Sequence, residues 1–535
     1  MPSDNTNKCS QNKSVRVLHK STALCPVCFR ELECEIFTIP DEVESPGEPS
    51  SDSGANSLGC EVKQSSAVYM MRTCPEHGET ITRIWNDAAH YEWLRGHAHP
   101  KVKPPAPNFP VRDRCPFGCG TCSRHERMGT LLEIEVTRNC NLHCPVCFMS
   151  ADTGDSDPTL AEIGAMYDTI ANAVGVDGAV QLTGGEPTCR ADLADIVRAG
   201  RQRGFWGIEL NTNGIVLAGR TGYLENLVEA GLTGVYLSFD GISGDVYKTT
   251  CGRDILDVKL RAIERCRECN IQVVLSVAVV AGLNDSQLGD ILQFAMDNSD
   301  VVAGIALQPA FTSGRYEVGE NAPLVGGDLS GAKSYEGHDD IPLTGDDVTG
   351  TKSRETHGGI PLTGGDVIFK LAEQSHGLLD PYDIWPLGTS HPLCDSGVFL
   401  LRDPEEKHES GFWPASKMMT MQEYMQGFNP HSPQGSVFLD ILHKRGVPYS
   451  DGLSIIVMNY MDAHTMDTQR LRECSMMVTT PEGLPLPFCS YHLTDTCGKR
   501  IYPTWLKPEL TNDLSPLSRF EDLEGFLSSK RESAQ

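Results

Sequence analysis

Val136-Thr137-Arg138-Asn139-Cys140-Asn141-Leu142-His143-Cys144-Pro145-Val146-Cys147 is the stretch from which the fold class of this chain follows. It begins where an alternating apolar run over 131–136 ends, and such a run predicts a β-strand. Its three cysteines have the spacing C-x3-C-x2-C. Three thiolates in one short loop fit a cubane [4Fe–4S] cluster with one iron left open. A zinc site is the alternative, but zinc loops usually offer C-x2-C pairs that complete a tetrahedron.

A C-x3-C-x2-C loop that follows the first strand of a catalytic core resembles the signature of the radical S-adenosylmethionine (SAM) superfamily. The resemblance implies that Cys140, Cys144 and Cys147 hold the catalytic cluster. It also implies that the amino and carboxylate groups of SAM chelate the open iron. One electron from the cluster would then cleave SAM to a 5′-deoxyadenosyl radical, which takes hydrogen from an unactivated carbon of the substrate.

Apolar, β-rich segments alternate with helical segments between residues 131 and 315, which predicts βα units on a parallel sheet. The predicted strands are 131–136, 179–182, 207–210, 235–239, 271–280 and 303–308. The predicted helices include 160–174, 193–203 and 256–269. The fold class is therefore α/β, and the resemblance implies a partial (β/α)6 radical SAM barrel. Its functional groups are expected at the carboxyl ends of the strands.

Glycine-rich and polar segments follow several of these strands. Thr183-Gly184-Gly185-Glu186-Pro187, after the second strand, resembles the superfamily segment that receives the amino group of SAM. Glycine suits a chain that passes very close to a ligand. Asn213, Ser238 and Asp240 follow the third and fourth strands, and the resemblance implies contacts with the ribose and carboxylate of SAM. The segment 281–285 is expected to frame the adenine.

Residues 1–99 are predicted to form a rubredoxin-like metal module. Cys25 and Cys28 form a C-P-x-C knuckle, and Cys74-Pro75-Glu76-His77-Gly78 is a similar turn. Two such knuckles across a hairpin can hold one mononuclear iron or zinc ion tetrahedrally. The spacing leaves the fourth ligand open among His77, Cys60 and Cys34. A purely structural zinc ribbon without electron transfer is the alternative reading of this module.

Two further cysteine groups predict one or two auxiliary [4Fe–4S] clusters. The first group is a second C-x3-C-x2-C motif, whose glycines permit a tightly wrapped backbone. The second group is scattered through the C-terminal part of the chain and is expected to converge in space. The predicted ligands are Cys115, Cys119 and Cys122 in the first group and Cys394, Cys474 and Cys489 in the second.

These observations divide the chain into five predicted parts. After the metal module come a linker with the auxiliary cluster loop over 100–130 and the radical SAM core over 131–315. Residues 316–365 are rich in Gly, Asp, Thr and Ser and contain a duplicated segment, which we interpret as a surface insertion without catalytic residues. Residues 366–535 are expected to form a C-terminal α+β domain that binds an auxiliary cluster and substrate.

Composition restricts compartment and partners. No apolar run among the 535 residues reaches the roughly 18 residues that cross a bilayer, and residues 1–20 lack the apolar core of a signal peptide. The 20 cysteines of a cytoplasmic protein are metal ligands or free thiols rather than disulfides. The net charge of −27 argues against nucleic acid as partner. We expect a cytoplasmic protein with at most peripheral membrane contact and an electron donor such as ferredoxin or flavodoxin.

The order of the cysteine motifs, across the chain apart from 316–365, resembles the archaeal tetraether lipid synthase group. Members of this group are also labelled dihydro-hydroxymethylpterin methyltransferases. The resemblance implies radical C–C coupling of alkyl or isoprenoid lipid tails, so the expected substrate is a lipid or another apolar molecule. The alternatives are radical C-methylation of a reduced hydroxymethylpterin and a non-catalytic iron–sulfur electron carrier. A large apolar tunnel would favour the lipid, and a small polar pocket would favour the pterin.

Overall fold

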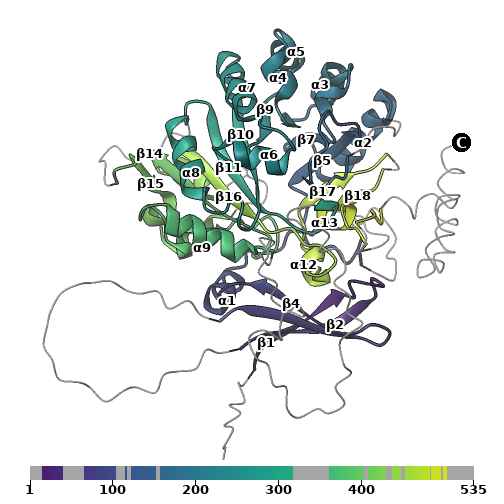
Figure 1. The fold of residues 1–535 in the computed structure, drawn as a ribbon, viewed down its shortest axis with the longest axis vertical. Helices are drawn as coiled ribbons and strands as arrows, with labels where there is room; N and C mark the ends of the chain where they lie inside the picture. Colours follow the sequence, from purple (N-terminus) through teal and green to yellow (C-terminus); the bar gives the residue numbers. More distant parts are fainter. Residues whose placement is uncertain are drawn as a thin grey trace, which may run out of the picture.

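The computed structural model describes residues 15–39, 66–103, 115–116, 122–151, 157–316, 361–402, 408–428, 437–446, 452–481, 483–495 and 498–502. Cys60 and Cys119 lie outside these residues, as does most of the predicted insertion. Within the described parts, a small N-terminal sheet lies beside a large α/β body (Figure 1). No helix of these parts has the length and apolar character that a membrane crossing requires.

The small sheet is an antiparallel meander in chain order. It consists of β1 (Arg16–Leu24), β2 (Glu31–Thr38), β3 (Val68–Cys74) and β4 (Gly78–Trp85), and α1 (Ala88–Gly96) follows it. Because the strands alternate in direction, the β1–β2 and β3–β4 turns lie at the same end of the sheet. The two predicted metal knuckles occupy these two turns.

The large sheet contains twelve strands, of which eight in succession are parallel. In spatial order the parallel strands are β16 (Gly452–Met458), β11 (Val302–Pro309), β10 (Gln272–Val279), β9 (Gly234–Ser238), β8 (Gly207–Thr212), β7 (Ala179–Gly184), β5 (Leu131–Thr137) and β17 (Met476–Thr479). All six strands predicted for 131–315 are among them. The α/β class with a parallel sheet is therefore confirmed.

Shorter strands complete the sheet structure. The antiparallel strands at its edges are β13 (Trp385–Pro386), β14 (Asp395–Arg402), β15 (Phe412–Pro414) and β18 (Pro485–Pro487). A separate two-stranded pairing joins β6 (Val146–Cys147) to β12 (Arg315–Tyr316). The second pairing connects the cysteine loop to the chain that follows β11.

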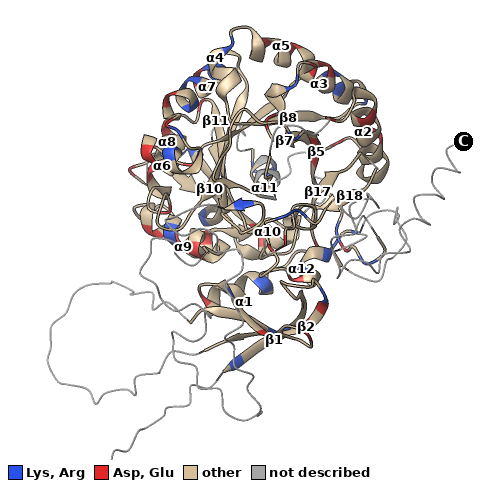
Figure 2. Cartoon of the chain, turned by 45° about the vertical axis from the view of Figure 1, so that its right-hand side comes forward, with Lys and Arg blue, Asp and Glu red and all other residues tan. Residues whose placement is uncertain are grey.

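Helices surround the parallel strands and carry most of the charged residues visible on the outside (Figure 2). They include α2 (Leu160–Val174), α3 (Leu193–Gln202), α4 (Ile215–Gly219), α5 (Tyr223–Ala230), α6 (Gly244–Thr250), α7 (Leu256–Glu268), α8 (Leu288–Asp297) and α9 (Gly364–Gln374). The C-terminal part adds α10 (Met421–Gly427), α11 (Val437–Lys444), α12 (Thr468–Arg472) and α13 (Phe488–Tyr491). The predicted helices over 160–174, 193–203 and 256–269 correspond to α2, α3 and α7.

Alternate residues of each parallel strand face two different environments. On β5, Leu132, Ile134 and Val136 are buried in the main hydrophobic core beneath the helices. The residues between them, Glu133 and Glu135, therefore point to the other face of the sheet, because successive side chains of a strand alternate. That other face encloses the cavity described below.

The described residues of the C-terminal part, for which we expected an α+β domain over 366–535, contribute strands to the large sheet. Strands β16 and β17 pair with β11 and β5, the two outer strands of the predicted six-stranded core. A six-stranded open sheet leaves two unpaired edges, which are unfavourable. The later strands cover both edges, and they thereby become part of the same sheet.

Candidate active site and metal centres

A cavity of about 690 Å³ lies against the inner face of the large sheet. The predicted cluster ligands and most of the residues predicted to bind SAM line it, whereas no residue of 281–285, expected to frame the adenine, does. The predicted residues that line it are Cys140, Cys144, Cys147, Gly184, Gly185, Glu186, Asn213, Ser238 and Asp240. The parallel strands bring them together because their carboxyl ends meet at one edge of the sheet.

The glycine pair after β7 packs directly on the cysteine loop. The amide of Gly185 donates to the carbonyl of Thr137 at 2.9 Å, and that of Glu186 donates to the carbonyl of Asn139 at 2.9 Å. A Cβ at Gly184 or Gly185 would overlap these same carbonyl oxygens. We expected glycine here because of a ligand, but the structure shows that contact with the cysteine loop already requires it.

The Glu186 carboxylate is buried and engaged within the protein. Its Oε1 accepts hydrogen bonds from the Thr188 amide at 3.1 Å and the Thr212 hydroxyl at 2.7 Å, and its Oε2 accepts from the Asn213 amide at 2.7 Å. Only 1% of Glu186 is exposed. Glu186 therefore connects the ends of β7 and β8 and fixes the position of Asn213, whose side chain in turn donates to Asn141 of the cysteine loop at 2.7 Å.

Lys259 is a buried cation beneath these strand ends. Its ammonium donates to the Asn213 carbonyl and to the Ser238 hydroxyl, each at 2.8 Å, and none of the residue is exposed. Burial lowers the pKa of Lys259, and the nearby Asp240 carboxylate opposes that shift. Burial raises the pKa of Asp240, and Lys259 counteracts this. Lys259 thus supports two residues predicted to contact SAM.

The three cysteine thiols of the loop lie in a partly buried setting. Burial is the main reason that the pKa of Cys140 rises to about 11. The pKa of Cys144 is also raised, first by its hydrogen bond with the Cys251 thiol and then by burial. Metal-free Cys140 and Cys144 are therefore protonated at neutral pH, so cluster binding must release their protons. The Arg315 guanidinium fixes the loop from outside by donating to the Cys144 carbonyl at 2.8 Å.

The donor set fits an open [4Fe–4S] cluster. Three soft thiols of one loop share a cavity wall, and their backbone is fixed by the glycine pair and by Arg315. The cavity continues past them along the strand ends that carry Asn213, Ser238 and Asp240. Cys251 adds a fourth thiol beside Cys144, and nothing in its sequence context indicated this contact.

The second predicted cysteine group reaches the same cavity. The cavity is lined by Cys394, Cys474 and Cys489. These residues come from separate parts of the chain: Cys394 precedes β14, Cys474 precedes β17, and Cys489 follows β18. Burial raises the pKa of Cys474, and the neighbouring Cys489 and Cys394 thiols raise it further. Buried Arg470 donates to the Cys394 sulfur at 3.3 Å and supplies positive charge to the group.

The N-terminal turns bring together a four-residue group that could hold a metal ion. One ligand atom each from Cys25, Cys28, Cys74 and His77 lies within 4.8 Å of all the others. The Cys74 sulfur is 3.4 Å and the Cys25 sulfur 3.6 Å from Nδ1 of His77. Three thiols and one imidazole fit tetrahedral zinc or iron. Of the fourth ligands left open, the structure brings His77 to the group, whereas Cys34 is buried in the hydrophobic core.

The loop predicted to bind a further cluster is described only in part. Cys115 is buried in an apolar cluster with Leu24, Leu471 and Cys489, and Cys122 is half-buried. Cys119 lies outside the described residues. The Cys115–Cys119–Cys122 cluster therefore stays a prediction.

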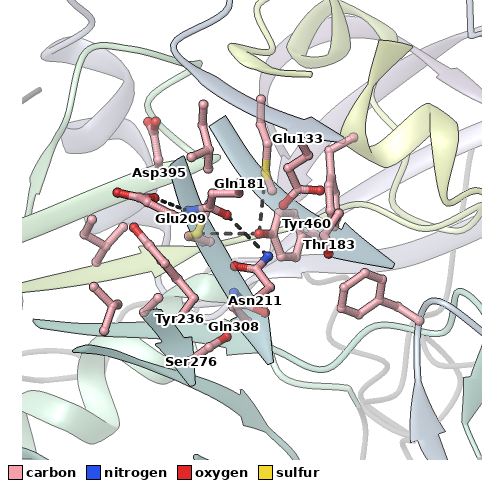
Figure 3. A pocket seen from close by; sticks show the side chains of 18 of the residues that line it. Glu133, Gln181, Thr183, Glu209, Asn211, Tyr236, Ser276, Gln308, Asp395 and Tyr460 are labelled. Carbon is pink, nitrogen blue, oxygen red and sulfur yellow. Dashed lines mark hydrogen bonds between the residues drawn. The ribbon is translucent and has the colours of Figure 1, made fainter. Parts of the chain in front are cut away.

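Polar side chains line one part of the inner face of the sheet (Figure 3), although the greater part of the cavity's lining surface is apolar. They belong to successive strands from β5 to β11 and are Glu133, Gln181, Thr183, Glu209, Asn211, Tyr236, Ser276 and Gln308. Gln181 donates to Glu209 at 3.1 Å and accepts from Asn211 at 3.4 Å. Apolar side chains, among them Val274, Ile305, Ile456 and Met458, line the side formed by β10, β11 and β16.

These polar residues and Lys259 were not identified from the sequence, although the sequence contains a signal for each. Strands of parallel sheets usually read as continuous apolar runs, whereas β5, β7, β8 and β9 alternate apolar with polar residues. Such alternation indicates a solvated or ligand-binding inner face. Lys259 shares the helical spacing of buried Ala262, Ile263 and Cys266, which placed it on the buried face of α7.

Comparison with known proteins gives a family for the core. Residues 134–295 match the family model described as the radical SAM superfamily. A "7,8-dihydro-6-hydroxymethylpterin dimethyltransferase" of Methanocaldococcus jannaschii is 33% identical over 302 residues, which cover 56% of this chain and 54% of that protein. A "Probable GTP 3',8-cyclase" of Pyrococcus abyssi is 34% identical over 172 residues, 32% of this chain and 55% of that protein.

This chain thus spans about half the length of each of these two relatives. Among solved structures, SuiB of Streptococcus suis bound to S-adenosylmethionine is similar with a TM-score of 0.32 and 16% identity. That similarity covers 37% of this chain and 45% of SuiB.

Proposed function

Since residues 134–295 form a radical SAM domain, we propose that this chain is a radical SAM enzyme that methylates a reduced pterin or a related 2-amino-4-oxopyrimidine. When bound, the cluster and SAM supply reductive cleavage of SAM and abstraction of a hydrogen atom from a substrate carbon. The polar inner face of the cavity is the observation that carries the substrate class. A lipid tail has no hydrogen-bonding groups, and burying these polar side chains against it would cost free energy.

The names of two relatives support the same class. One is named for a hydroxymethylpterin and the other for GTP. Both molecules carry a 2-amino-4-oxopyrimidine ring, which is flat and has several hydrogen-bond donors and acceptors. A cavity of about 690 Å³ that is polar on one side and apolar on the other suits such a ring beside a cofactor.

Each group of residues has a role in this proposal. Cys140, Cys144 and Cys147 would hold the cluster, and the glycine pair with Glu186 holds their loop against the strand ends. Asn213, Ser238 and Asp240, supported by Lys259, would bind SAM. The polar inner face binds the substrate below them. An electron carrier needs no such cavity, which argues against a non-catalytic function.

Joining of lipid tails is a second candidate because of two specific observations. The β10, β11 and β16 side of the cavity is apolar, with Val274, Ile305 and Ile456 facing it. A second cysteine group, Cys394, Cys474 and Cys489, also reaches the cavity. An auxiliary cluster there would suit the capture of one carbon radical while another is generated.

The remaining centres complete the proposal. Cys25, Cys28, Cys74 and His77 would bind one iron or zinc ion, and Cys394, Cys474 and Cys489 would bind an auxiliary [4Fe–4S] cluster. A small electron carrier such as ferredoxin or flavodoxin would reduce the catalytic cluster. With a net charge of −27, we expect no nucleic-acid partner, and a cytoplasmic location with at most peripheral membrane contact.

One anaerobic experiment tests both candidates. The reconstituted chain is incubated with SAM and dithionite, together with either 7,8-dihydro-6-hydroxymethylpterin or a diether phospholipid. 5′-Deoxyadenosine and product masses are measured. The proposal predicts pterin-dependent 5′-deoxyadenosine and, once a methyl donor is present, a pterin heavier by one or two methyl groups.

Cys144→Ala is the control and should give neither readout, because it lacks a cluster ligand. If the lipid product is lighter by the hydrogens lost on coupling and the pterin is unchanged, the protein joins lipid tails and does not methylate a pterin. If the fully loaded protein cleaves no SAM with either molecule, the enzymatic proposal itself is wrong.

A further inference from the structure

We infer that Glu133 is the specificity-determining residue that binds the donor edge of the substrate, namely the exocyclic amine and adjacent ring N–H of a 2-amino-4-oxopyrimidine. This inference rests on the proposed function and assigns its substrate class to one side chain.

Glu133 is a buried carboxyl group that faces the cavity without a partner. Only 3% of it is exposed, and it lines the cavity from the centre of β5 (Figure 3). Within the described residues, no hydrogen bond or ion pair reaches its side chain. A buried carboxyl without a partner costs free energy, so a ligand that supplies hydrogen bonds would stabilise it.

The neighbouring amides are joined in a chain of hydrogen bonds. Glu209 is a carboxyl and accepts from Nε2 of Gln181 at 3.1 Å, which sets the orientation of that amide. Its Oε1 then accepts from Asn211 Nδ2 at 3.4 Å. Asn211 is left with an Oδ1 that has no partner among the described residues. The chain of bonds therefore ends in a buried acceptor, and among the described residues no hydrogen bond from these amides reaches Glu133.

The hydroxyl of Tyr460, a donor near Glu133, is engaged with other side chains. The Tyr460 hydroxyl lies 3.5 Å from the sulfurs of both Met458 and Met476. Tyr236 of β9 contacts Gln181. Neither phenol has a hydrogen bond to Glu133 among the described residues. The carboxyl group of Glu133 thus remains free to accept hydrogen bonds from a ligand.

The positively charged side chains near Glu133 are paired with a different carboxylate. The arginines of this region, Arg138 and Arg500, pair with Glu135 at 3.0 and 3.6 Å. The titratable groups that face Glu133 are Glu135 on β5, Tyr236 on β9 and Tyr460 after β16. Burial, with a smaller effect of Glu135, raises the pKa of Glu133 to about 8. A ligand with two donors would favour the ionised carboxylate.

The geometry of the ligand follows from that of a carboxylate. Two carboxylate oxygens accept two parallel N–H groups, as in bidentate pairs with guanidinium. The amine and ring N–H of a 2-amino-4-oxopyrimidine are adjacent and parallel, and so form this pair. A lipid tail has neither donor. A hydrogen bond to a charged group contributes enough that its loss weakens binding by about ten- to hundredfold.

The test compares two ligands and three proteins by equilibrium binding. The ligands are 7,8-dihydro-6-hydroxymethylpterin and its 2-oxo analogue, in which an oxygen replaces the amine. The proteins are the wild type, Glu133→Gln and the control Glu229→Gln, all as full chains with reconstituted clusters and SAM but without reductant. Glu229 is exposed on α5, so its variant makes the same chemical change away from the cavity.

We expect the wild type and Glu229→Gln to prefer the amino ligand by at least about tenfold. Glu133→Gln should lose this preference, because its amide N–H opposes an N–H group of the amino ligand and donates instead to the 2-oxo oxygen of the analogue. Glutamine resembles the protonated Glu133 that prevails at neutral pH, so the variant should fold, and its SAM binding should be unchanged.

Two results would overturn the inference while leaving the proposed function intact. One is an unaltered preference for the amino ligand in Glu133→Gln. The other is weaker binding of SAM, rather than of the pterin, in this variant. A wild-type protein that binds neither heterocycle would refute the proposed pterin function itself, and the inference with it.

Discussion

Single residues after β7 determine whether the cysteine loop and the strand ends can approach each other. Gly184 and Gly185 allow two backbone hydrogen bonds to the loop, and Glu186 then binds the amide of Asn213. Neither contact involves a ligand. The segment that resembles a SAM-binding motif therefore also builds the wall on which a cluster would be assembled.

Gly185→Ala tests this role. The added Cβ would overlap the Asn139 carbonyl and displace the cysteine loop. A displacement of about 1 Å at a catalytic centre can lower the rate about hundredfold. We expect reduced iron content after reconstitution and a loss of SAM cleavage of that order, measured by iron analysis and 5′-deoxyadenosine formation.

Gly219→Ala on α4 is the matched control, because a Cβ there meets no described atom within 4 Å. This variant should keep its iron and activity. Equal iron and equal activity in both variants would show that the cysteine loop does not depend on Gly185.

The raised pKa of Glu133 predicts a dependence of stability on pH. Burial raises the pKa of Glu133 to about 8 in the folded chain, from an ordinary value near 4.5. Between these values the unfolded state has lost the proton and the folded state keeps it. Wild-type stability should therefore fall with rising pH by up to about 1.4 kcal/mol per unit relative to Glu133→Gln.

The measurement is the free energy of unfolding of the ligand-free wild type and of Glu133→Gln from pH 5 to 9. The two proteins should be similar near pH 5, and the variant should become the more stable one by pH 8. A constant difference across this range would mean that Glu133 does not titrate as described.

At the scale of elements, α12 connects the N-terminal sheet to the cavity. Its capping residue Asp467 accepts from Ser21 of β1 at 2.9 Å, and Thr468 accepts or donates to Thr22 at 2.6 Å. Arg470 of the same short helix donates to the sulfur of Cys394. The small sheet, whose turns we propose to bind a metal ion, and the second cysteine group are thus linked through the short helix α12.

Metal binding by the β1–β2 and β3–β4 turns can be tested by cobalt substitution. Tetrahedral Co²⁺ absorbs visible light, and the bands shift when sulfur replaces nitrogen as a ligand. We expect His77→Cys to bind with shifted bands. Loss of a residue that only supports a metal ligand lowers metal affinity roughly 10- to 100-fold. Because His77 would be a ligand itself, His77→Ala should lower the affinity for Co²⁺ by more than that.

Cys34→Ala is the control that separates the two candidate ligands, since Cys34 lies in the core of the same sheet. Its cobalt spectrum should match the wild type. If Cys34→Ala alters the cobalt spectrum and His77→Ala does not, then Cys34 is the fourth ligand and His77 is not. Removal of metal with a chelator should lower the unfolding temperature of the wild type and leave that of Cys74→Ala unchanged.

At the scale of the whole molecule, β16 and β17 make the core dependent on the C-terminal part. A fragment of residues 131–316 would expose the edges of β11 and β5. Open edges of parallel strands promote association between chains. We expect this fragment to aggregate in size-exclusion chromatography, whereas the chain with residues 361–502 elutes as a defined species. A monomeric, folded fragment would show that the six-stranded core is independent after all.

Sequence patterns predicted the local parts of this architecture well. The six strands of the core and helices α2, α3 and α7 are confirmed, and residues 134–295 match the radical SAM family model, because each of these depends on periodicity or on closely spaced residues. The placement of β16 and β17 could not be predicted in this way. Their pairings join residues 150 positions apart (Gly304 with Ser454) and 345 positions apart (Leu131 with Met476), and neither strand differs in composition from one of a separate domain.

The candidate site likewise has a part that the sequence predicts and a part that only the packed structure shows. The cysteine loop and the strand ends converge as the (β/α) arrangement requires, because parallel strands bring their carboxyl ends together. Lys259, Cys251 and the unpartnered Glu133 could be recognised only when helices and strands were packed. Each depends on a contact with a residue of another element.

The pairing of β17 with β5 also has a consequence for synthesis of the chain. Leu131 begins β5 and pairs with Met476, so the ribosome makes the cysteine loop long before the strand that closes the sheet beside it. Until residues 452–487 have emerged, the nascent chain has a cysteine loop at an open sheet edge. A carrier that delivers iron–sulfur clusters during translation would meet this open form, whereas one that acts after release would meet the closed cavity.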